Sequence, residues 1–197
     1  MNNKIVTSLV CFVCCSTFVA TLAIAKTVKV QNSPRPFTVV PPDSWEQQPT
    51  LTGNSRIKFT SPLGTPPATC AVIVIEIPQL KDVPQSTFSQ GMAEPPDIDG
   101  FTAQLSSGVN NVKVVSANNA VLFGFPSQRV NVQYSSGTPS GEIWFRGITD
   151  TTVTTPGISW AVSCGGSGKN LDEAKKAFSY WQSEIIRFPT NVKIQKK

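Results

Sequence analysis

The chain has 197 residues, of which 40% are hydrophobic, and this length suffices for one domain with a substantial apolar core. It contains no histidine, which excludes Ser-His-Asp and Cys-His catalytic arrangements as well as metal sites built on imidazole. The formal net charge is +5, but the basic residues are scattered, which indicates a mildly basic solvated surface rather than a nucleic-acid partner.

Residues 1–25 have the composition of a secretory signal peptide. Lys4 supplies a positive charge, the stretch from Ile5 to Leu22 is largely apolar, and Ala23-Ile24-Ala25 offers the small side chains that a signal peptidase requires. We therefore expect a mature protein that begins at Lys26, is exported to the periplasm or the exterior, and retains no membrane span. The alternative is an uncleaved anchor, because Ile5 to Ala25 is nearly long enough to cross a bilayer.

A single domain is predicted over residues 37–190, after a polar, proline-punctuated segment (26–36) that we expect to be a flexible leader. The first strands are predicted at Phe37–Val40, Arg56–Thr60 and Cys70–Ile77, bounded by turn residues. Both faces of the third segment are apolar, which predicts a central strand that is covered on both sides.

The middle of the chain is predicted to hold a short helix, a loop and an antiparallel meander. The helix is expected over Pro84–Met92 with Ser86 as its cap, and Ala93–Gly100 as a solvated loop. An Asn118-Asn119 turn is expected to separate the first two strands of the meander. The later features are a strand around Arg129–Tyr134 with one wet face, a turn at Gly137–Gly141, and strands over Glu142–Thr152 and Gly157–Cys164.

The chain is predicted to close with one long helix and a basic tail (191–197). Asn170 is a natural N-cap, Glu173 completes a capping box, and Pro189 ends the helix. Apolar residues recur at steps of three and four and bury one helix face against the sheet: Leu171, Ala174, Phe178, Trp181, Ile185 and Phe188. Antiparallel strands followed by a closing helix predict an α+β fold, with an antiparallel β-sheet packed against helices.

The glycine-rich segment Gly165–Asn170 imitates a phosphate-binding loop between a strand and a helix. However, Ser163 stands where a Walker motif needs glycine, and Asn170 stands where it needs Ser or Thr. We interpret the segment as a flexible turn into the helix cap.

Removal of the signal peptide leaves two of the five cysteines, Cys70 and Cys164. An even pair in an exported protein predicts a disulfide, the alternative being two buried free thiols. If the two strands are antiparallel neighbours, pairing the cysteines also sets Val72 opposite Val162, so that apolar residues meet along one face.

No residue is assigned a catalytic role, and neither a metal site nor a cofactor site is predicted. Carboxylates are the acid–base groups that remain, and Glu76 on its apolar strand is interpreted as a residue beyond the sheet edge, paired with Lys or Arg. A candidate binding site is Trp144 with Arg146, which share one face of their strand. The alternative is that the closing helix covers Trp144 while Arg146 extends outward.

Three segments resemble PsbP-like proteins. They are Phe37–Trp45 (FTVVPPDSW), Phe123–Arg129 (FGFPSQR), and the last Trp-containing strand with its small-residue turn and a helix that ends near Phe188-Pro189. The similarity in element order runs from Phe37 to about Phe188. The resemblance implies an antiparallel sheet between helices. It also implies a family of mostly non-catalytic binding proteins, whose members include an extrinsic photosystem II subunit and a nuclear-import factor. The resemblance also implies that this chain is an accessory protein that binds a partner.

These observations favour an exported, non-catalytic accessory protein that binds a protein or an envelope component. One alternative is a small-ligand carrier with an apolar pocket between sheet and helix. Another is a hydrolase that uses only carboxylates, for instance on glycans. The sequence leaves the oligomeric state open.

Overall fold

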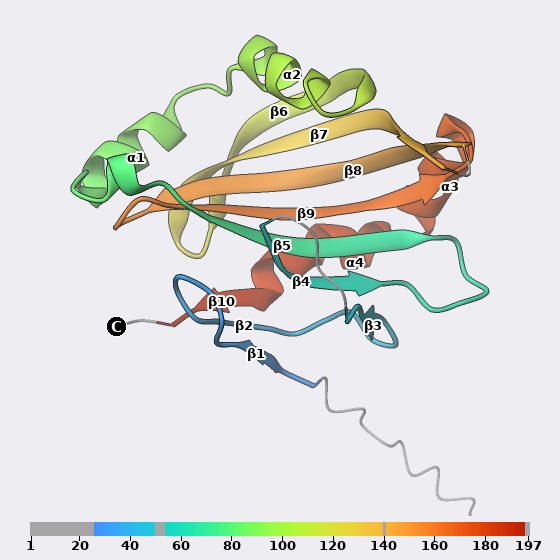
Figure 1. Cartoon of the computed structure of the whole chain (residues 1–197), viewed down its shortest axis with the longest axis horizontal. Coiled ribbons are helices and arrows are strands. Elements are labelled where there is room, and N and C mark those ends of the chain that lie inside the picture. The colour runs from blue at the N-terminus through green and yellow to red at the C-terminus, as the bar shows by residue number, and fades with distance from the viewer. Residues whose placement is uncertain (1–25, 50–53, 140, 196–197) are drawn as a thin grey trace, which may run out of the picture.

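A seven-stranded antiparallel sheet forms the centre of the molecule (Figure 1). The computed structural model describes residues 26–49, 54–139 and 141–195, so the predicted signal peptide lies outside the described residues. In spatial order the strands are β3 (Glu46–Gln47), β4 (Ser55–Thr60), β5 (Ala68–Glu76), β9 (Ile158–Gly168), β8 (Gly141–Thr154), β7 (Phe125–Thr138) and β6 (Asn110–Leu122).

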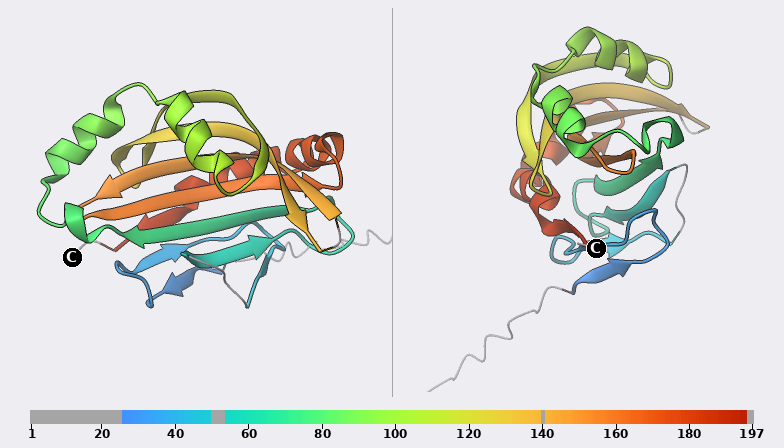
Figure 2. Two further views of the ribbon diagram at one scale, coloured as in Figure 1. Left: turned by 45° about the horizontal axis from the view of Figure 1, so that its top comes forward. Right: turned by 90° about the vertical axis from the view of Figure 1, so that its left-hand side faces the viewer.

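The two faces of this sheet carry different layers. Helices α1 (Gln85–Ala93) and α2 (Ile98–Ser106) lie over one face, on the side of β6 and β7 (Figures 1 and 2). The opposite face packs against α3 (Leu171–Tyr180), α4 (Gln182–Arg187) and a small sheet of β1 (Val28–Val30), β2 (Phe37–Val39) and β10 (Val192–Ile194). Two single-turn 3₁₀ helices, η1 (Pro78–Leu80) and η2 (Phe188–Asn191), complete the chain. The predicted α+β class is confirmed.

Trp160 ties the layers together from the centre of the core. Its side chain is fully buried and meets the rings of Phe37, from the small sheet, and Phe123, from the β6–β7 turn, at 5.7 and 5.2 Å between centroids. The indole Nε1 donates to the hydroxyl of Thr154 at 3.0 Å, so the buried polar atom is satisfied. The small sheet and the β6–β7 turn are therefore fixed to the same core as the large sheet.

The register predicted from the cysteines is present in the structure. Cys70 and Cys164 form a disulfide with Cα atoms 4.1 Å apart, and Val72 pairs with Val162. All four side chains are buried. The opposite face of β5 is less covered, because Ile75 is 39% exposed, so the expectation of a strand buried on both sides is wrong.

The two ends of the domain differ from the sequence prediction. The expected flexible leader (26–36) contains β1, which pairs with β2 and buries Val30. The expected basic tail (191–197) contains β10, which pairs with the other edge of β2 and buries Val192. Three-residue strands have too few positions to show an alternating pattern, and their partner lies far away in the sequence.

The middle of the chain also differs from the sequence prediction. Asn118-Asn119 is not a turn, because β6 runs unbroken past it and the hairpin closes instead at Phe123 and Gly124, which have φ values of 57° and 84°. Positive φ at both positions is what a tight hairpin turn requires. Part of the predicted loop forms α2, whose N-cap Asp97 accepts a hydrogen bond from the amide of Gly100 at 2.9 Å. Ser86 does not cap α1, which begins after Pro84.

The closing helix is divided in two at Trp181, where the backbone leaves the helical conformation. Its predicted start is confirmed: Asn170 accepts from the amide of Glu173 at 2.9 Å, and the Glu173 carboxylate accepts from the amide of Lys169 at 2.9 Å. The preceding glycines are not a flexible turn, because β9 continues to Gly168 and pairs with β8 throughout.

Gly166 explains why this segment is rich in glycine. A Cβ atom at this position would lie 2.2 Å from the backbone nitrogen of Phe178 and 2.6 Å from the carbonyl carbon of Ala177. The absence of a side chain thus lets the backbone of α3 lie directly on β9. This close packing positions α3 over the face of β8 that carries the candidate binding residues.

Candidate functional site

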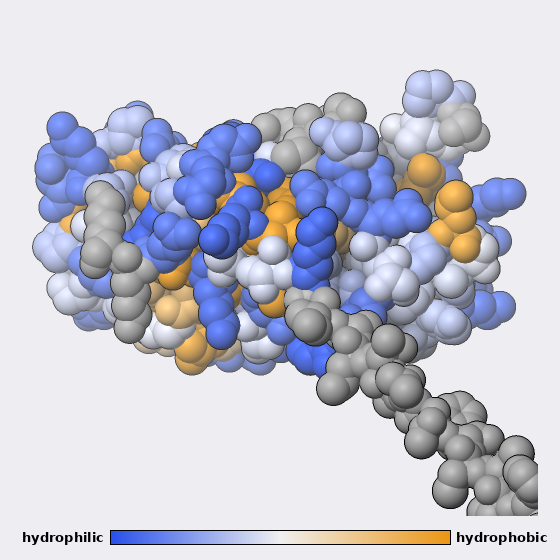
Figure 3. Space-filling model, turned by 90° about the horizontal axis from the view of Figure 1, so that it is seen from below, coloured by the Kyte–Doolittle hydropathy of each residue, from blue (hydrophilic) through white to orange (hydrophobic). Residues whose placement is uncertain are grey.

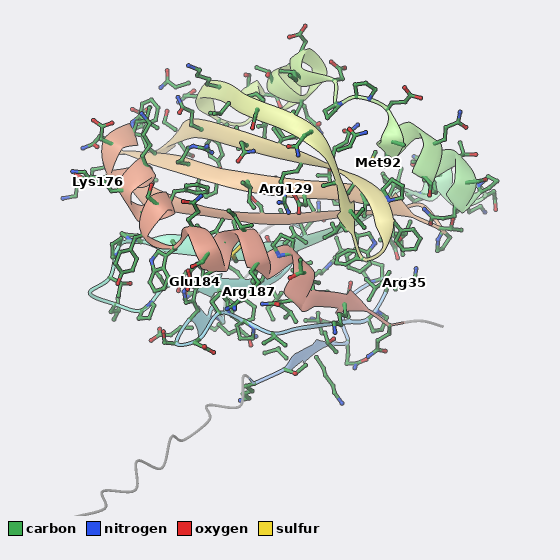
Figure 4. All side chains as sticks on the ribbon, turned by 180° about the vertical axis from the view of Figure 1, so that it is seen from behind. Arg35, Met92, Arg129, Lys176, Glu184 and Arg187 are labelled. Atoms are coloured by element: carbon green, nitrogen blue, oxygen red, sulfur yellow. A yellow bond between two sulfur atoms is a disulfide. The ribbon has the colours of Figure 1, made fainter. Side chains whose placement is uncertain are left out.

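Strands β7 and β8 bring six polar or aromatic side chains onto the face that α3 and α4 cover. Three cross-strand pairs contribute them: Ser135 with Trp144, Gln133 with Arg146, and Arg129 with Asp150. Because alternate residues of a strand share a face, all six point to the same side. We call this surface the β7–β8 polar face, and Figure 4 shows Arg129 projecting from it above α4.

Arg146 lies partly beneath α3 rather than extending outward. Its guanidinium carbon is 4.8 Å from the centre of the Phe178 ring, a cation–π contact. Nη1 donates to the carbonyls of Gly147 at 2.9 Å and Val132 at 3.3 Å. Burial lowers the pKa of Arg146, because the charged guanidinium is partly removed from water. Within the described ranges no carboxylate forms an ion pair with it.

Trp144 is half-buried beside Arg146, so the structure places the two predicted residues together on one face, as their spacing implied. Neither is freely exposed. The sequence correctly indicated their shared face, but it did not indicate that Phe178 would cover the guanidinium.

Arg129 and Asp150 form an ion pair that the sequence analysis did not identify. Nε and Nη2 of Arg129 each lie 2.6 Å from one oxygen of the Asp150 carboxylate, which is fully buried. The hydrogen bond to Asp150 raises the pKa of Arg129 above its ordinary value. The predicted turn at Gly137–Gly141 did not give this register, because the hairpin closes at Thr138 and Gly141, and that closing pair sets Arg129 opposite Asp150.

The acidic side chains near these elements have structural partners. Asp97 caps α2, the Glu173 carboxylate accepts from the amide of Lys169 at the start of α3, and Glu142 accepts a 2.6 Å hydrogen bond from the hydroxyl of Ser135. Glu76 is exposed, but it is the last residue of β5 and pairs with Ile158 of β9, so the expected position beyond the sheet edge is wrong. No described Lys or Arg forms an ion pair with it. The described residues include no group of three His, Cys, Asp or Glu side chains that could hold a metal ion.

Two cavities with largely apolar linings open on the surface. One, of about 470 Å³, lies where α3 meets the ends of β8 and β9, and residues such as Pro66, Ile143, Gly168, Lys176 and Ala177 line it. The other, of about 500 Å³, lies between the β6–β7 turn and β10; we call it the hairpin cavity. Both volumes are in the range of small-molecule sites. The first corresponds in place to the apolar pocket between sheet and helix that the sequence analysis considered.

Solved structures share this arrangement. The cyanobacterial PsbP protein (CyanoP) of Synechocystis sp. PCC 6803 matches 89% of this chain and 96% of its own, with a TM-score of 0.52 and 12% sequence identity. The chain has a PsbP-like fold. LpqN of Mycobacterium tuberculosis, a protein involved in cell envelope biogenesis, matches 87% of this chain and 91% of its own, with a TM-score of 0.50 and 13% identity.

The PsbP-like fold confirms the resemblance indicated by the short motifs, over most of the described chain. No protein-family model matches the chain, and no curated protein matches it in sequence. At such low identity the similarity concerns the fold and not the functional residues.

Proposed function

We propose that this protein is an exported, non-catalytic accessory protein that binds a protein or an envelope component. The disulfide supports export, because such bonds persist in oxidising compartments. The fold supports the accessory role, because it is shared over nearly its whole length with PsbP and with LpqN, whose role is in cell envelope biogenesis. In the part of the chain that the structure describes, no helix is long and apolar enough to span a membrane.

The observation that carries the proposal is the difference between two arginines on the β7–β8 polar face. The guanidinium of Arg129 is paired with the Asp150 carboxylate. Arg146 is half-buried and contacts two carbonyls and the Phe178 ring, but no described carboxylate pairs with it. A carboxylate from a partner would complete this site. Arg and Trp are also the side chains that most often contribute strongly to binding, and Trp144 lies beside Arg146.

Affinity capture from the native envelope tests the proposal. The full chain with Arg146→Gln, or with both Trp144→Ala and Arg146→Gln, should lose the captured partner while the melting temperature stays nearly unchanged. Arg187→Gln is the matched control, because Arg187 is exposed on α4 (Figure 4) and should retain the partner. Equal capture by Arg146→Gln and wild type would contradict docking through this face. A large fall in melting temperature would instead assign both residues to the core.

A small-ligand carrier is the second candidate, and the cavity of about 470 Å³ against α3 favours it. The sequence-based alternative of a glycan hydrolase that uses only carboxylates stays a hypothesis. A carrier should copurify with a ligand that native mass spectrometry detects, and a hydrolase should release sugars from envelope glycans.

A further inference from the structure

The hairpin cavity joins segments from both ends and the middle of the chain. Its apolar walls come from the β6–β7 turn, from η2 and from β10: Val121, Phe123, Phe125, Pro189, Val192 and Ile194. In Figure 3 apolar surface is visible in this region, at the lower left, and Figure 4 shows Arg35 between the closed end of the hairpin and the C-terminal strand. The cavity lies apart from the β7–β8 polar face.

The base of the cavity is held rigidly. The left-handed backbone of Phe123 is unusual for a bulky side chain, and its ring packs edge-on against the buried Trp160. Pro189 and Val192 are buried, the latter in the strand pairing with β2. Val121 is 70% exposed at the opening. An apolar ligand would therefore meet a preformed site and would not have to order it.

The charged residues at the opening are all basic. Arg35 and Lys193 line the cavity, and among the described residues no acidic side chain lines it. The cavity against α3 differs, because Glu173 lines it together with Lys169 and Lys176. Nε of Arg35 donates to the carbonyl of Gln195 at 3.4 Å, which holds the guanidinium beside β10. Glu76 shares a smaller neighbouring cavity with Arg35 but forms no ion pair with it.

We propose that the hairpin cavity binds a single-chain anionic amphiphile, with its acyl chain among the apolar walls and its anionic head group beside Arg35 and Lys193. Apolar walls favour a hydrocarbon chain, and a purely basic opening favours a negative head group, so charge complementarity and hydrophobicity select the same class of molecule. This site is additional to the proposed partner-binding face and does not depend on it.

Isothermal titration calorimetry with dodecanoate, below its micelle concentration, tests the proposal on the wild-type protein. Saturable binding with one site is expected, and it should weaken as salt screens the head group. Arg35→Glu with Lys193→Glu should lower the affinity for dodecanoate about tenfold, whereas affinity for dodecanol, a neutral probe of equal chain length, should change little. Lys81→Glu is the charge control, because Lys81 is exposed and does not line the cavity.

Blocking the opening gives a second test. Val121→Trp should abolish binding of both probes without unfolding the protein, since position 121 is exposed. Leu63→Trp, at a position that is 94% exposed and outside the cavity, should leave binding intact. The proposal is wrong if wild type shows no saturable binding, if dodecanol binds as tightly as dodecanoate, or if both tryptophan variants behave alike. Binding to phosphatidylglycerol vesicles without binding of free dodecanoate would also overturn it, in favour of a membrane-contact surface.

Discussion

Arg129 on β7 donates hydrogen bonds to both carboxylate oxygens of Asp150 on the neighbouring strand β8, and the carboxylate is fully buried. Such a pair gains from two charge-assisted hydrogen bonds but must offset the removal of two charges from water. Breaking one half of it is therefore much more costly than replacing the whole pair with apolar side chains.

The first prediction concerns this asymmetry. Asp150→Ala should destabilise the protein by about 3–5 kcal/mol in urea unfolding, because it leaves the Arg129 guanidinium partly buried and unpaired. The double variant Arg129→Met with Asp150→Leu should lose much less, and the double-mutant cycle should show strong coupling. A loss below about 1 kcal/mol in Asp150→Ala would mean that water compensates Arg129 fully.

The register of this pair follows once the closing residues of the β7–β8 hairpin are known, and the predicted turn at Gly137–Gly141 missed them by one residue. A hairpin that closes at Thr138 and Gly141 places Arg129 nine residues before and Asp150 nine residues after the closing pair, which sets them opposite each other. The same type of register argument correctly matched Cys70 with Cys164, where apolar neighbours confirmed the choice. Alternating apolar and polar residues in the long strands thus predicted most of the large sheet.

Other features could not be read from the sequence, for physical reasons. Phe123 is a poor residue for a left-handed turn position by its own preference, and its packing against the core, including Trp160, offsets that cost. The strands β1 and β10 depend on contacts between the two chain ends. The environment of Arg146 depends on how closely α3 approaches β9. The glycines of β9 permit this close approach, but their presence in the sequence does not predict it.

The disulfide gives the second prediction. The bond joins residues 94 positions apart, and on the chain-entropy model closing so long a loop stabilises the fold by about 4–5 kcal/mol. Replacing Cys70 and Cys164 together by alanine should lower the free energy of unfolding by about this amount. Thiol counting on the unfolded, unreduced protein from its native source should find no free thiol. Two free thiols would show that the bond does not form in the native protein.

Tyr134 gives a prediction about pH. Burial raises the pKa of Tyr134, whose ring stacks on Phe145 at 4.9 Å. The neutral phenol therefore contributes stability that is complete below pH 10 or so, the unfolded value, and is lost as pH rises through the higher folded pKa. In Tyr180→Phe, where Tyr134 is the one tyrosine left, absorbance titration should give a midpoint above that of the same chain in urea. Tyr134→Phe should flatten the alkaline loss of stability, and an unchanged loss would contradict the assignment.

Gly166 and Gly137 form a matched pair for the packing of α3. Gly166→Ala should destabilise the protein by at least about 2 kcal/mol, because its Cβ would meet the backbone of α3, which has no flexible side chain to move aside. Gly137→Ala should stay within about 0.5 kcal/mol, since nothing lies within 4 Å of a Cβ there. Circular dichroism melts compare the two. Similar melting temperatures would mean that α3 packs less closely than the structure indicates.

Trp181 tests whether the junction between α3 and α4 is core or docking surface. The indole Nε1 donates to the carbonyl of Pro66 at 2.8 Å, and the ring meets that of Trp45 at 5.4 Å, but the side chain keeps part of its exposure. Trp181→Ala should therefore cost about 2–4 kcal/mol, somewhat less than a fully buried tryptophan. Trp181→Phe should retain most of the packing and lose about 1 kcal/mol with the hydrogen bond.

Tyr180→Ala is the control, since that side chain is 60% exposed and should change stability little. If Trp181→Ala unfolds like wild type, the indole is dispensable for folding and its apolar surface is available to a partner.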